Sequence, residues 1–90
     1  MIPLKWEKAA AENYREIMGK LPPYRQEQVD EWLDGLREWP PRKWYELREK
    51  DGVIRFHLDN DKFLKILGRF EEREGVAYIT HFEWRSERRG

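Results

Sequence analysis

The chain has 90 residues, enough for one domain spanning residues 1–90, and its 18 basic and 18 acidic side chains cancel to a formal net charge of zero. It has no cysteine, which excludes disulfides, thiol nucleophiles and cysteine zinc sites and favours a reducing cytoplasm. No apolar run approaches the ~20 residues of a membrane span and no signal-peptide pattern opens the chain, so we expect a cytoplasmic protein without membrane contact.

The N-terminal part has helical periodicity. After a short lead-in over Met1 to Leu4, apolar residues recur every three or four positions from Lys5 to Leu21. This spacing predicts a first helix that ends near Gly19.

A second helix is predicted after Pro22 and Pro23, which break the first helix and suit the first turn of the next. It should run to about Glu38, and Gly35 inside it would permit close packing on the first helix. Because the connection is short, we expect an antiparallel helical hairpin.

The second half of the chain has strand signals. Asp51-Gly52, the Asx-rich segment 59–61 and the charged segment 71–75 are turn sequences between apolar runs. We expect four strands, at residues 44–48, 54–58, 63–70 and 76–84. Since all connections are short, the strands should be antiparallel neighbours in sequence order.

These elements predict a two-layer α+β domain in which the helical hairpin covers one face of a small four-stranded antiparallel sheet. Alternation assigns one set of strand residues to the core: Ile54, Phe56, Leu58, Leu64, Ile66 and Phe70. Arg55 and His57 would then face away from the helices. In the last strand both sets of alternating residues are partly apolar, so its covered face stays open.

No metal-binding motif and no phosphate-binding glycine loop are present, and we expect neither a metal nor another cofactor. What remains is cationic: Arg55, His57, Lys65, Arg69 and the tail from Arg85 to Arg89 could meet on one side of the sheet and hold phosphates. Metal-free RNA cleavage needs little more, namely a base for the 2′-hydroxyl, cations for the developing charge and an acid for the leaving oxygen.

Each of these residues also has a structural interpretation. Arg and Lys are common at exposed strand positions, and an aromatic residue at a strand end, such as Trp84, more often covers the core than stacks on a base. His81, between Thr80 and Phe82, is more typical of a half-buried structural histidine than of a catalyst.

The order of elements resembles the RelE/ParE superfamily of type II toxins, including its HigB-like branch. The matching stretches are WYELRE, VIRFHLDNDKFLKILGRF and VAYITHFEWRSERR, which together with the two preceding helices cover nearly the whole chain. The resemblance implies a RelE-like fold, a cognate antitoxin as partner and metal-independent endoribonuclease activity on mRNA in the ribosome.

Carried over by position, the resemblance makes His57 the base, Arg55 and Lys65 phosphate-holding groups, and Arg85 a transition-state stabiliser or acid. Further RNA contacts would come from Arg69, Trp84, Arg88 and Arg89.

Two features depart from the ribonuclease members of the superfamily. The chain is formally neutral, and no tyrosine follows the last strand. They leave open a ParE-like alternative, a non-enzymatic gyrase inhibitor with the same fold, or a phage or mobile-element interaction protein.

Overall fold

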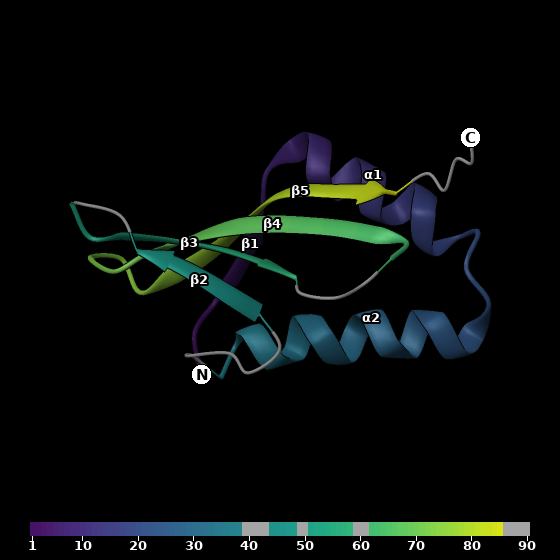
Figure 1. The fold of residues 1–90 in the computed structure, drawn as a ribbon, viewed down its shortest axis with the longest axis horizontal. Coiled ribbons are helices and arrows are strands. Elements are labelled where there is room, and N and C mark those ends of the chain that lie inside the picture. The colour runs from purple at the N-terminus through teal and green to yellow at the C-terminus, as the bar shows by residue number, and fades with distance from the viewer. Residues whose placement is uncertain (39–43, 49–50, 59–61, 86–90) are drawn as a thin grey trace.

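The computed structural model describes residues 1–38, 44–48, 51–58 and 62–85, and Figure 1 shows the chain as a ribbon. The elements are β1 (Leu4–Trp6), α1 (Lys8–Met18), α2 (Pro23–Leu36), β2 (Trp44–Arg48), β3 (Val53–Leu58), β4 (Leu64–Glu71) and β5 (Val76–Trp84). The predicted α+β class, the second helix beginning at the proline pair and the four predicted strands are therefore confirmed to within a few residues.

The strands form one five-stranded sheet in the order β1-β5-β4-β3-β2. From β2 to β5 each strand pairs antiparallel with the next one in sequence, as predicted. Asp51 and Gly52, between β2 and β3, both have positive φ, at 66° and 77°, as a tight hairpin turn requires. The predicted turn at 59–61 lies outside the described residues.

The N-terminal prediction was wrong. Residues 4–6 form strand β1, which pairs parallel with β5, with Leu4 beside Ala77 and Trp6 beside Ile79. The sheet is therefore mixed and has five strands rather than four antiparallel ones. The helix begins only at Lys8, because Glu7 is extended and its N–H donates to the carbonyl of Ile79. Pairing with the open edge of β5 outweighs the helical periodicity of this segment.

The helices and one face of the sheet share a single core. The six strand residues assigned to it by alternation are all buried, at 1 to 8% exposure. From the helices, Ala10, Val29, Leu33 and Leu36 join the same cluster. Figure 1 shows α1 alongside β5 and α2 on the side of β2 and β3. On the other face of the sheet, Arg55, His57 and Lys65 are exposed.

Polar contacts join the two helices. The Tyr14 hydroxyl donates to Asp30 at 3.0 Å, and the Gln26 amide donates to the carbonyls of Met18, the last residue of α1, and of Leu21, which follows that helix. A Cβ added to Gly35 would meet no atom within 4 Å, so the expected close helix packing at this glycine is wrong.

Candidate functional site

The face of the sheet opposite the core carries most of the predicted site. Arg55 and His57 on β3 and Lys65 on β4 are exposed, while Leu67 and Arg69 on β4 are half-buried. They occupy the strand positions between the buried core residues, which explains why simple alternation located them correctly.

A β-bulge adds a second set of side chains to this face. Gly68 pairs with Ile79 and Leu67 pairs with His81, so Thr80 is one residue too many on β5. The extra residue reverses the alternation: Ala77 and Ile79 are buried before it and Phe82 after it. The sequence left open which of the two alternating sets of residues in the last strand is buried. In the structure neither set is buried throughout.

The residues around this bulge line a hollow of about 200 Å³. Its lining consists of Arg55, Phe56, His57, Leu67, Gly68, Thr80 and His81. The hollow brings together two predicted site residues, Arg55 and His57, and adds a second histidine, which we had interpreted as structural. Gly68 permits the closeness of this packing, since a Cβ there would lie 2.4 Å from both the Phe56 ring and the Tyr78 carbonyl oxygen.

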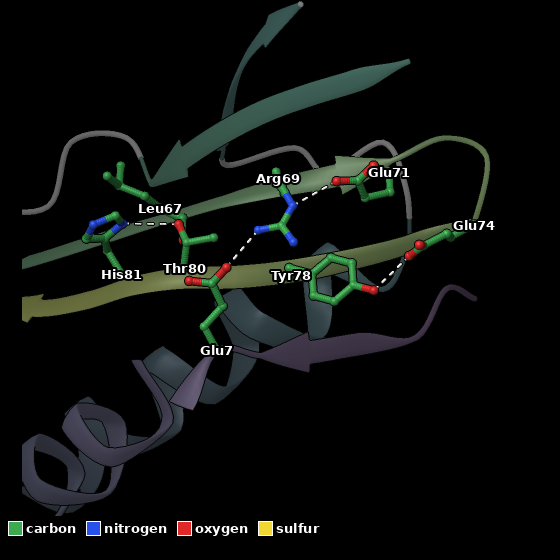
Figure 2. A network of polar contacts seen from close by, with 8 residues as sticks. All are labelled: Glu7, Leu67, Arg69, Glu71, Glu74, Tyr78, Thr80 and His81. Atoms are coloured by element: carbon green, nitrogen blue, oxygen red, sulfur yellow. Dashed lines mark hydrogen bonds and ion pairs between the residues drawn. The ribbon is translucent and has the colours of Figure 1, made fainter. Parts of the chain in front are cut away.

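Hydrogen bonds orient both imidazoles. The His57 Nδ1 lies 3.3 Å from the carbonyl oxygen of Leu58. On the other side of the hollow, the Thr80 hydroxyl donates to the Leu67 carbonyl at 3.2 Å and lies 3.1 Å from His81 Nδ1 (Figure 2). Each ring is thus held through Nδ1.

Arg69 lies further along the same face and belongs to a separate network, shown in Figure 2. Its guanidinium donates to Glu7 and to Glu71, each at 2.8 Å, and stacks 4.4 Å from the centre of the Tyr78 ring. The hydrogen bond to Glu7, followed by that to Glu71, raises the pKa of the Arg69 guanidinium. The Tyr78 hydroxyl donates to Glu74, and this bond raises the pKa of Tyr78. Two carboxylates therefore already balance the charge of Arg69.

The remaining predicted residues lie outside the hollow. Lys65 is in register with Glu83, and Trp84, 50% exposed, ends β5. Arg85 follows it, four residues beyond His81, which at the rise of an extended strand is roughly 13 Å along the sheet. Arg88 and Arg89 lie outside the described residues. Of the four predicted catalytic residues, Arg55 and His57 line the hollow, Lys65 lies on β4 and Arg85 directly follows β5.

A second, larger hollow of about 600 Å³ opens between β1, α1 and α2. Apolar side chains, among them Leu4, Trp6 and Leu33, line it together with Tyr14 and Asp30. Burial, and then the hydrogen bond to Asp30, raises the pKa of Tyr14. The sequence did not indicate this hollow, because residues 4–6, two of which line it, were predicted as the end of a lead-in and the start of a helix rather than as a strand.

Within the described part of the chain, no three His, Asp or Glu side chains gather in a way that could hold a metal ion. None of the described helices is long and apolar enough to cross a membrane.

Comparison with solved structures identifies the fold. The chain superimposes on a chain in the crystal structure of the archaeal RelE–RelB complex from Pyrococcus horikoshii OT3, with a TM-score of 0.71 over 97% of this chain and 98% of that one. The two sequences are 15% identical. No protein-family model matches the sequence, and no curated protein matches it. The two chains thus share a fold although their sequences are only 15% identical.

Proposed function

We propose that this chain, which has a RelE-like fold, is the toxin of a type II toxin–antitoxin pair and a cytoplasmic endoribonuclease that cleaves ribosome-associated mRNA without a metal. One observation carries the nuclease part of the proposal. Arg55 and His57 line a single hollow at the middle of the open sheet face, where a phosphodiester would find a cation beside an imidazole. Imidazole is the side chain best suited to accept and donate protons near neutral pH.

In the proposed reaction His57 accepts the proton of the 2′-hydroxyl, and the 2′-oxygen attacks the adjacent phosphorus. The bond from phosphorus to the 5′-oxygen breaks, and the leaving oxygen takes up a proton. The products are a 2′,3′-cyclic phosphate and a 5′-hydroxyl. Arg55, which lines the same hollow, supplies positive charge for the oxygens of the pentacoordinate phosphorus in the transition state.

Lys65 and Arg85 extend the exposed surface from the hollow toward the end of β5, whereas Trp84, in register with the buried Leu64, lies on the core side of the sheet. Arg85 lies roughly 13 Å from His81 along the strand. We propose that Lys65 and Arg85 contact the phosphates of flanking nucleotides. Arg69 is a weaker RNA contact, since Glu7 and Glu71 already bind it.

A cognate antitoxin is the second part of the proposal. The structural neighbour is a RelE–RelB complex, and here the hollow between β1, α1 and α2, lined by both apolar and charged side chains, offers a surface for a partner chain outside the candidate RNA site. The test is co-expression with the short reading frame next to this gene. Restored growth of the host and co-purification would support the pairing, and toxicity unaffected by any neighbouring frame would contradict it.

Primer extension on translated mRNA tests the nuclease. The parent chain should produce cuts at defined positions, and His57→Ala and Arg55→Ala should each reduce cleavage by about 100-fold or more. Arg73→Ala, in the exposed turn between β4 and β5, is the matched control for loss of one arginine and should cleave like the parent. Absence of cleavage by the parent chain would refute the nuclease proposal.

The alternative is a ParE-like protein that inhibits gyrase without cleaving RNA. The saturation of Arg69 by two carboxylates, together with the net charge of zero, favours it, because both reduce attraction for RNA. A supercoiling assay with purified gyrase separates the two. Inhibition by the parent chain, with translated mRNA left intact, would establish the alternative.

A further inference from the structure

His81 and His57 flank one residue from opposite sides. Leu67 on β4 is in register with His57 on β3 and with His81 on β5, and all three line the hollow. Strands lie about 4.8 Å apart, so the two histidine positions are separated by about 10 Å across the sheet. A phosphodiester seated over Leu67 would have one imidazole on each side.

This placement matches what the reaction needs. Attack at phosphorus and departure of the leaving group occur roughly in line, so the attacking 2′-oxygen and the leaving 5′-oxygen are on opposite sides of the phosphorus. A base and an acid that serve them must therefore stand on opposite sides as well. With His57 as the base on one side, the acid belongs on the other, at His81.

The hydrogen bonds of Thr80 determine which nitrogen of His81 exchanges protons. A hydroxyl has one proton to donate, and Thr80 gives it to the carbonyl of Leu67. Toward His81 the Thr80 oxygen is then an acceptor, so Nδ1 carries a hydrogen in both charge states of the ring. The proton that comes and goes is on Nε2.

The β-bulge is what makes this arrangement possible. Without the extra residue, strict alternation would not place Thr80 and His81 together on the face that carries His57. Bulges often redirect a side chain next to an active site. Here the irregularity supplies both the imidazole and the hydroxyl that orients it.

We propose that His81 is the general acid of the nuclease, a catalytic residue, and that Thr80 is its positioning residue; this rests on the proposed RNA cleavage. The His81 imidazolium delivers its Nε2 proton to the 5′-oxygen as the P–O5′ bond breaks. The ring ends neutral, while His57 ends protonated by the 2′-hydroxyl. Proton exchange with solvent restores both.

Other charged groups on this face have to be considered in the pH dependence of the cleavage rate. Arg55 on β3 borders the hollow, Arg69 and Glu71 lie toward one end of β4, and Lys65 with its register partner Glu83 lies toward the other. Among the side-chain types on this face, imidazole is the one that ordinarily exchanges a proton between about pH 5 and 8. The rate should therefore follow a bell-shaped profile whose two limbs belong to the two imidazoles.

The test is single-turnover cleavage of ribosome-bound mRNA across this pH range. His81→Ala should lose about 100-fold or more in rate and remove the limb at high pH, where an acid must stay protonated. Glu83→Gln, on the same strand and face, is the matched control and should keep the rate and both limbs. Thr80→Val should show a smaller loss that Thr80→Ser restores, because serine keeps the hydroxyl.

A modified substrate identifies the acid directly. When sulfur replaces the scissile 5′-oxygen, the leaving thiolate needs no proton, because a thiol is far more acidic than an alcohol. This substrate should restore the rate of His81→Ala and leave His57→Ala defective. Two results would overturn the assignment of His81 without touching the proposed function. In the first, the parent cleaves and His81→Ala cleaves at the same rate. In the second, His81→Ala is slower but keeps both limbs of the pH profile. No cleavage by the parent would overturn the proposed function, and this inference with it.

Discussion

Replacement of Gly68 by alanine is the sharpest test of how β4 packs against the buried Phe56 ring. The added methyl would lie 2.4 and 2.5 Å from two atoms of the Phe56 ring and 2.4 Å from the backbone oxygen of Tyr78. Phe56 is 2% exposed and the other obstacle is main chain, so neither gives way easily. Overpacking usually costs 1–3 kcal/mol, and we expect about 3 kcal/mol here.

This loss is large for so small a domain. A chain of this length typically has about 5 to 13 kcal/mol of stability, and 3 kcal/mol corresponds to a melting temperature lower by about 12 to 24 °C. Urea unfolding followed by tryptophan fluorescence measures it, with a midpoint expected to fall by about 1 to 3 M. The matched control is Gly35→Ala in α2, where the methyl meets nothing within 4 Å and should stabilise the helix by about 0.5 to 1 kcal/mol. Equal midpoints for parent and Gly68→Ala would refute the close approach of Phe56.

Three further predictions concern the contacts of the N-terminal segment. Arg69→Ala should lower the free energy of unfolding by about 1 kcal/mol, and by less at high salt. Arg69→Lys should recover only part of this loss, because an ammonium group cannot bind Glu7 and Glu71 in the way that the forked guanidinium does. Full recovery by lysine would contradict this explanation. In the absorbance titration of the folded protein, Tyr14→Phe should remove one tyrosine whose pKa is raised. The substitution should also lower the free energy of unfolding by about 0.5 to 1 kcal/mol. The pKa of Tyr14 is higher in the folded than in the unfolded chain, so its contribution to stability is present below about pH 10 and is lost as the pH rises through the folded pKa. If Tyr14→Phe leaves the titration unchanged, the hydrogen bond to Asp30 is not formed. Phe82→Ala should lower the free energy of unfolding, measured in urea, by about 3 to 5 kcal/mol, because its ring is fully buried and packs against both Trp6 and Tyr14; a loss below about 1 kcal/mol would argue against this packing.

The strands that obey simple periodicity could be predicted from the sequence. Ile54, Phe56 and Leu58 alternate with polar residues and are all buried, and the Asp51-Gly52 turn has the backbone angles that its residues favour. Strand β1 could not be found in this way. It has three residues, too few to show a period, and its partner in β5 is more than 70 residues away in the chain.

The candidate site was only partly predictable for a related reason. Arg55 and His57 follow from alternation, whereas Thr80 and His81 depend on a bulge that breaks it. The one signal in the sequence was Gly68 inside a strand, which often marks a bulge or a close approach. The ion pair between Arg69 and Glu7 could not be predicted either, because the two residues are 62 positions apart in the sequence.

The parallel pairing of β1 with β5 has a consequence for synthesis of the chain. Residues 4–6 find their partners only when residues 77–79 have been made, so a ribosome-bound nascent chain holds its first strand unpaired through most of translation. Hairpins β2–β3 and β3–β4 join near neighbours and can form earlier, whereas closing the longest loop comes last. A chain stopped before β5 should therefore leave Leu4 and Trp6 open to proteases and chaperones, and pulse proteolysis of stalled nascent chains would reveal it.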